Sequence, residues 1–162
     1  MPKTPARRRA AVVALGLAAA VVLVACNLIN PKNTGNLQQL LTESEAAWSS
    51  SGIHNYEYDF QHSCDNCVGD SVSGVHIIVK NDVITSVTLL GGGTPSVPMS
   101  TYPTVLQLFS ITQSALTANT TLIQATFNAA QGWPVSVQIV PKSNQFAIGQ
   151  FYVLAGLVKD SL

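Results

Sequence analysis

The apolar and polar residues of the chain follow two different spacings, which predict helices and strands in turn. Between residues 37 and 50 the apolar side chains recur every three or four positions and stop at a Ser-Ser-Ser-Gly run, as expected of one amphipathic helix. Residues 53–63 alternate instead, with Tyr56, Tyr58 and Phe60 on one side. That period of two predicts a strand whose aromatic face is buried and whose polar face meets water.

The rest of the chain repeats this order of one helix followed by strands. Two β-rich runs, 75–80 and 83–90, flank an Asn-Asp pair. Both of these residues tolerate positive φ, so they predict a tight hairpin. A proline followed by apolar residues at helical spacing predicts a second helix over 103–117. Three further strands are predicted at 122–128, 133–140 and 150–159. The last run is also compatible with a short helix, but its Phe-Tyr-Val sequence favours a strand.

This order predicts an α+β fold. In one antiparallel sheet of about six strands with two helices on one face, every apolar stripe is buried between the sheet and the helices. We expect residues 37–162 to form one such domain, which is an ordinary size for a single core. The two halves, 37–90 and 103–159, also allow a diverged αβββ repeat.

The N-terminal residues predict an exported protein. A basic cluster precedes an uncharged run of about 16 apolar residues, which is short for a bilayer of roughly 30 Å and fits a secretory signal segment. The run ends at Leu23-Val24-Ala25-Cys26, which resembles the lipobox of bacterial lipoproteins. This resemblance implies cleavage after residue 25, with 1–25 as the signal peptide, and lipidation of Cys26. The lipid would anchor the protein to the outer face of the bacterial cell membrane, with 26–36 as a tether.

Charge narrows the partners that we expect. Four of the eight basic residues lie in the predicted signal segment and all eight acids lie outside it, so the mature chain carries a net charge of −4. The four remaining basic residues are scattered lysines, and no arginine is left. A chain of this kind lacks the basic surface that nucleic acids require. Its expected contact with the membrane is therefore the lipid on Cys26.

Two cysteines at close spacing are the main candidates for chemistry. Cys64 and Cys67 would lie in an oxidising compartment, which favours a local disulfide that fixes the turn after the strand. A thiol-redox pair is the first alternative. The second is a metal site in which His62 joins the two cysteines, with His54 or His76 as a fourth ligand.

Other catalytic patterns are missing from the sequence. There is no His-Glu-x-x-His, serine elbow or nucleotide-binding loop, and we expect no cofactor. Two acids on the polar side of the first strand, Glu57 and Asp59, suit acid–base chemistry, a cation site or a solvated strand face, and the solvated face is favoured. Trp133 and Tyr102 are candidates for an exposed contact surface, although Trp133 also suits a plug at the end of the core.

An ordered set of landmarks resembles a family of bacterial secreted and lipid-anchored domains of unknown function. The landmarks are Trp48, the Tyr56, Tyr58 and Phe60 strand, Cys64 and Cys67, the valine-rich hairpin over 75–87, Leu108-Phe109, and Gly132-Trp133-Pro134. The chain departs from the pattern where Phe127-Asn128 replaces Tyr-Asp and where Val140 replaces an Asp. The resemblance implies fold and location and assigns no activity.

We therefore predict a lipid-anchored exported protein with a non-catalytic module that binds a protein or another ligand in the cell envelope. The alternative is a thiol-redox or metal-handling lipoprotein that uses Cys64 and Cys67.

Overall fold

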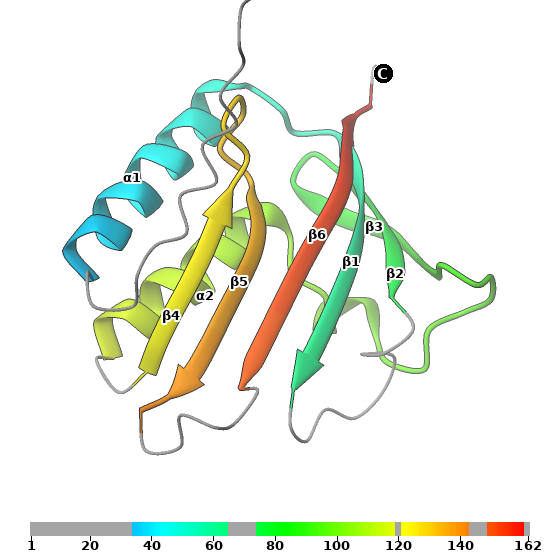
Figure 1. The fold of residues 1–162 in the computed structure, drawn as a ribbon. Coiled ribbons are helices and arrows are strands. Elements are labelled where there is room, and N and C mark those ends of the chain that lie inside the picture. The colour runs from blue at the N-terminus through cyan, green and yellow to red at the C-terminus, as the bar shows by residue number, and fades with distance from the viewer. Residues whose placement is uncertain (1–33, 65–73, 119–120, 143–148, 161–162) are drawn as a thin grey trace, which may run out of the picture.

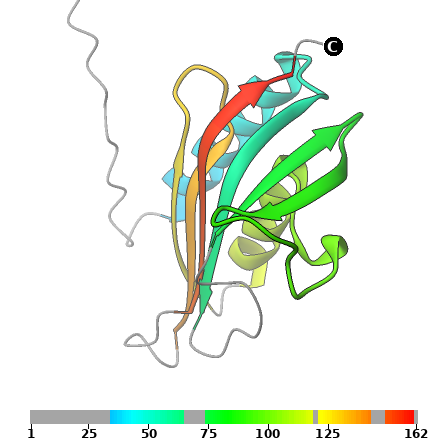
Figure 2. The same ribbon diagram turned by 90° about the vertical axis from the view of Figure 1, so that its right-hand side faces the viewer.

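The computed structural model describes residues 34–64, 74–118, 121–142 and 149–160. They form two layers, a six-stranded sheet and two helices that lie together on one of its faces (Figures 1 and 2). The elements are, in order, α1 (Thr34–Ser50), β1 (Tyr56–Cys64), β2 (Val75–Lys80), β3 (Val83–Leu89), η1 (Met99–Thr101), α2 (Val105–Ala118), β4 (Thr121–Phe127), β5 (Pro134–Pro141) and β6 (Gln150–Lys159).

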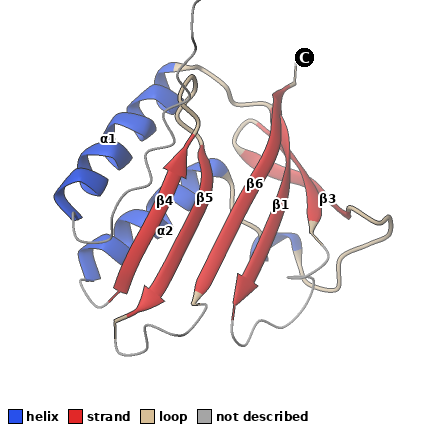
Figure 3. Cartoon of the chain, in the orientation of Figure 1, coloured by secondary structure: helices blue, strands red, loops and turns tan. Residues whose placement is uncertain are grey.

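The predicted α+β class and antiparallel sheet are confirmed, and Figure 3 distinguishes the helices from the strands by colour. The strand order is β3-β2-β1-β6-β5-β4, and every neighbouring pair is antiparallel. The first and last strands therefore pair at the centre. The αβββ repeat is not confirmed, because β1 is a central strand whereas β4, its counterpart in the second half, lies at an edge.

The hairpin between β2 and β3 has the predicted two-residue turn. Asn81 and Asp82 have φ values of 50° and 62°, the left-handed conformation that such a turn requires at both positions. The turn also docks on the chain before β1, where the Asn81 N–H donates to the side-chain carbonyl of Asn55 at 2.8 Å. His54 lies 2.7 Å from the Asp82 carboxylate at the same place.

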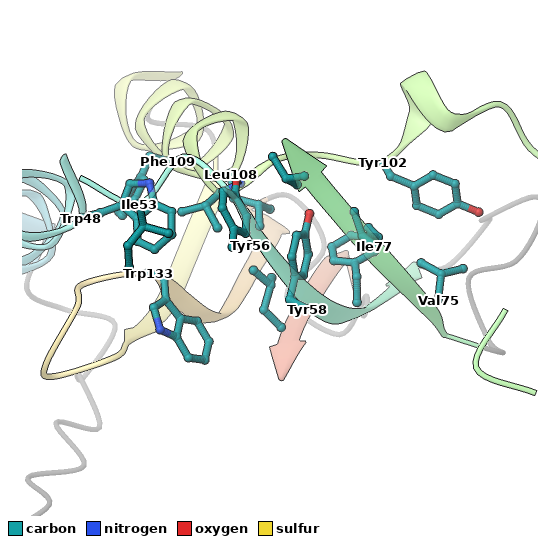
Figure 4. Packing of buried hydrophobic residues seen from close by; sticks show 14 of the residues in the cluster. Trp48, Ile53, Tyr56, Tyr58, Val75, Ile77, Tyr102, Leu108, Phe109 and Trp133 are labelled. Atoms are coloured by element: carbon teal, nitrogen blue, oxygen red, sulfur yellow. The ribbon is translucent and has the colours of Figure 1, made fainter. Parts of the chain in front are cut away.

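The aromatic side of β1 forms the centre of the core between sheet and helices (Figure 4). Tyr56 and Tyr58 have no exposed surface, and their rings stack with centroids 5.9 Å apart. Their hydroxyls hold the start of α2: Tyr58 donates to the Pro103 carbonyl, and Tyr56 accepts the Val105 N–H at 3.2 Å. The Tyr-x-Tyr pattern therefore supplies both apolar burial and the polar contacts that position the second helix.

A capping box completes the start of α2. The Thr104 hydroxyl accepts the Gln107 N–H at 3.3 Å, and the Gln107 side chain accepts the Thr104 N–H at 2.7 Å. These two bonds satisfy N–H groups that a helix cannot pair internally.

The turn between β4 and β5 is held against α1. The Asn128 side-chain oxygen accepts the N–H groups of Ala130 and Gln131 at 3.0 and 2.9 Å. Gly132 follows with φ of 81°, so close to α1 that a Cβ there would lie 2.1 Å from the Ser44 carbonyl oxygen. Only glycine, which has no Cβ, fits at position 132. The glycine therefore sets how closely the turn approaches the helix.

None of the helices in the described part of the chain is long and apolar enough to cross a membrane.

Candidate functional site

Within the residues that the structure describes, both helices lie on one face of the sheet, and we call the other face the open face. In β1 the side chains of Tyr56, Tyr58 and Phe60 point into the core, so the alternate positions point to the other side. The registers between strands extend that side across the sheet. Its polar side chains are Glu57, Asp59 and Gln61, His76 and Lys80, Ser86 and Thr88, Ser136 and Gln138, and Gln124 and Thr126.

The register between β1 and β2 brings three ionisable side chains together on this face. His76 lies opposite Asp59 on the neighbouring strand, and its Nδ1 is 2.9 Å from an Asp59 oxygen. Its Nε2 is 3.5 Å from an oxygen of Glu57. The imidazole is thus held between two carboxylates, and all three side chains are partly exposed, 34% for the histidine and 45% for each acid.

Apolar side chains flank this cluster. Val158 of β6 lies opposite Glu57, and Ile78 of β2 lies on the other side of the same residue. Ala155 is the neighbour of Asp59. Val158 is 56% exposed, although it belongs to a central strand. Polar groups set among accessible apolar ones are the mixture found on protein contact surfaces.

The sequence placed the two acids on the solvent side of β1, and the structure agrees. It named His76 as a possible fourth metal ligand, whereas the structure joins it to both acids. Only the strand register makes this connection, because His76 is 17 residues from Asp59 in the chain.

The three histidines considered for a metal site lie apart from one another, and Cys67 is outside the described residues. His62 points to the helix side of the sheet, where its ring stacks on Tyr152 at 4.5 Å and its Nε2 lies 2.6 Å from the Gln150 side-chain oxygen. His76 lies on the opposite face of the sheet. His54 comes just before the first residue of β1, at the other end of that strand from Cys64. Within the residues that the structure describes, no group of three or more His, Cys, Asp or Glu is placed to hold a metal ion.

Cys64 is the last residue of β1 and lies opposite Gln150. Cys67 and Cys26 lie outside the described residues, so the Cys64–Cys67 disulfide and the lipidation of Cys26 remain predictions.

The exposure expected of Trp133 and Tyr102 is wrong. Each side chain is only 8% exposed and belongs to the main core cluster. Trp133 donates its ring N–H to the Gln131 side chain at 3.2 Å, and Tyr102 packs edge-on against Phe60. Both residues lie in connections between elements, where a single large side chain gives no periodicity from which burial can be predicted. Trp133 is the core plug that the sequence also allowed.

The fold and the open face define a small α+β domain whose helices cover one side of its sheet and leave the other accessible. Residues 40–158 match a family of unknown function, DUF6174, and the chain belongs to that family. The matched region contains every landmark of the sequence pattern and excludes the predicted signal segment. No curated protein matches the chain, and no solved structure matches it.

Proposed function

We propose that this protein is an exported lipoprotein that uses the open face of its sheet to bind a protein partner in the cell envelope. Its N-terminal sequence supports export and attachment through Cys26, because basic, apolar and small-residue-Cys segments follow one another in the required order. The lipid would hold the domain at the outer face of the membrane, and the domain itself would act by binding, without catalysis.

One observation carries this proposal: accessible apolar residues surround a polar cluster on the open face. An exposed Val158 lies beside Glu57, which is itself paired with a histidine from the next strand. A single exposed valine is ordinary on a protein surface, but Val158, Ile78 and Ala155 together flank the cluster of Glu57, Asp59 and His76. A partner that covers this region would bury Val158 and retain polar contacts around it.

The proposal predicts a face-specific contact in intact cells. A photo-reactive benzoylphenylalanine at Val158 should form a discrete covalent adduct with one protein when the cells are irradiated. The matched control places the same residue at Ser110, which is exposed on α2 in the helix layer. The adduct at Val158 should be lost when Glu57→Lys is added, because that change reverses the charge beside the valine.

Equal adducts from Val158 and Ser110 would mean that the open face is not the contact surface. An absence of adducts at Val158, in a protein shown to be folded and exported, would also contradict the proposal.

A further inference from the structure

The imidazole of His76 lies between two carboxylates that it cannot satisfy equally when it is neutral. Its Nδ1 is 2.9 Å from an Asp59 oxygen, an ordinary hydrogen-bond distance, whereas its Nε2 is 3.5 Å from a Glu57 oxygen. A neutral imidazole carries one N–H, and an ionised carboxylate only accepts hydrogen bonds. The shorter contact therefore places the single proton on Nδ1, facing Asp59. The carboxylate of Glu57 then faces the lone pair of Nε2.

A second proton on the ring changes its contact with Glu57. Histidine is the side chain that ordinarily gains a proton between pH 5 and 8, and both nitrogens of the charged ring are donors. A proton taken from solvent onto Nε2 would let His76 donate to Glu57 as well as to Asp59. One side chain of β2 would then hold both acids of β1. Two carboxylates and a neutral ring carry a charge of −2, and the protonated ring reduces it to −1.

The strand registers place no other described ionisable side chain next to this ring. On the β3 side the cross-strand neighbour of His76 is Thr88, and β3 contains no ionisable residue. The other charged residue of β2 is Lys80, which is four positions away at the turn. In β6 the single charged residue is Lys159, which lies opposite Tyr56. Within the described residues, Glu57 and Asp59 are therefore the charged groups that face His76.

We propose that His76 is a proton switch that controls whether Glu57 can bind a basic side chain of the partner. Val158 and Ile78 lie on either side of Glu57, so a partner that covers these apolar residues must set a hydrogen-bond donor against the carboxylate. A lysine or arginine is the donor that also matches the negative charge of the cluster. In acid the protonated imidazole competes with that side chain for Glu57, and the complex weakens.

The inference deepens the proposed function and rests on it for the existence of the partner. It adds the chemistry of the partner's contact group, which is basic, and the direction of the pH dependence, which is loss of binding in acid. All three side chains of the cluster are partly exposed, so both solvent protons and a partner can reach them. A domain exported as predicted would experience the pH outside the cytoplasm.

The proton positions are tested first, and without any partner, by NMR of the full-length protein in detergent micelles. At about pH 7.5 the Nδ1 of His76 should carry hydrogen and the Nε2 should not, and at about pH 5.5 both nitrogens should carry hydrogen. The side-chain carboxyl resonance of Glu57 should shift together with the ring. A neutral ring with its hydrogen on Nε2, or a Glu57 carboxyl that does not follow the ring, would overturn the inference.

The consequence for binding is tested with the photo-reactive residue at Val158. Cells irradiated at about pH 5.5 should give about threefold less adduct than cells irradiated at about pH 7.5, a modest change because exposed ion pairs contribute little free energy. His76→Gln cannot gain a proton and should give the same yield at both pH values. The matched control is His54→Gln, which removes a histidine beside Asp82 at the β2–β3 turn and should keep the pH dependence.

The outcomes separate this inference from the proposed function. A fall in yield of the same size in His76→Gln would assign the pH response to the partner and overturn the inference, as would a yield that rises in acid. An absence of adduct at both pH values, in a folded and exported protein, would remove the open-face function and the binding role of the switch. The NMR measurement would still establish or exclude the proton switch itself.

Discussion

Replacing Gly132 with alanine is expected to lower the free energy of unfolding by about 3 kcal/mol or more. The glycine has φ of 81°, a conformation that costs other residues about 1–2 kcal/mol. Its missing Cβ also leaves room for α1, since the added carbon would lie 2.1 Å from the Ser44 carbonyl oxygen and 3.0 Å from the Ala47 Cβ. The blocking atom is backbone, so the turn and helix must separate, and forced repacking of this kind costs about 1–3 kcal/mol more.

Gly52 supplies the matched control for this prediction. It also has positive φ, 63°, but a Cβ there would meet nothing within 4 Å. Gly52→Ala should therefore show only the conformational cost of about 1–2 kcal/mol. Urea unfolding of both variants measures the difference. Equal losses would show that the approach of the β4–β5 turn to α1 is not tight.

Alkaline pH is expected to destabilise the protein between pH 10 and 12. Burial raises the pKa of Tyr56 from 10.0 to about 12, and burial raises the pKa of Tyr58 in the same direction. Below pH 10 these tyrosines are neutral in both folded and unfolded chains, so their contribution to stability is complete. Between pH 10 and 12 the unfolded chain ionises first, and stability falls. The loss from Tyr56 alone reaches about 3 kcal/mol above its folded pKa.

This loss is measured by urea unfolding at a series of alkaline pH values, together with the phenolate absorbance of the folded protein. Tyr56→Phe is the control. At neutral pH it should cost about 1–3 kcal/mol, because the buried Val105 N–H loses its acceptor. The same substitution should also make the fall in the free energy of unfolding between pH 10 and 12 shallower. The account is contradicted if all four tyrosines of the folded protein ionise together near pH 10.

Local patterns predicted the elements of this fold because each one carries its own period. The alternation of Tyr56, Tyr58 and Phe60 fixed which side of β1 is buried. In β6 the aromatic and β-branched residues correctly favoured a strand over a helix. Proline before α2 located the start of that helix to within two residues. Such signals depend on a few neighbouring positions, so the sequence alone supplies them.

The features that place the site depend on pairings between distant segments. No periodicity indicates that the first and last strands meet, or that β4 forms an edge. The contact between His76 and Asp59 follows from the β1–β2 register, which the sequence did not specify. Trp133 and Tyr102 lie in connecting segments whose burial depends on which elements meet around them. The hydrophobic pattern therefore predicted layers, and it left strand order and side-chain clusters undetermined.

Export and lipid attachment at Cys26 are the premise of the proposed function, and one measurement tests them directly. The protein is purified from the membrane fraction of its host, and its intact mass is determined together with its free thiols. The account predicts a chain that begins at Cys26, carries a diacylglycerol group there, and has no free thiol because Cys64 and Cys67 are joined. An unprocessed or unlipidated chain would contradict the account. Free thiols at Cys64 and Cys67 with bound zinc, or a disulfide that exchanges readily with glutathione, would instead support the redox or metal-handling alternative.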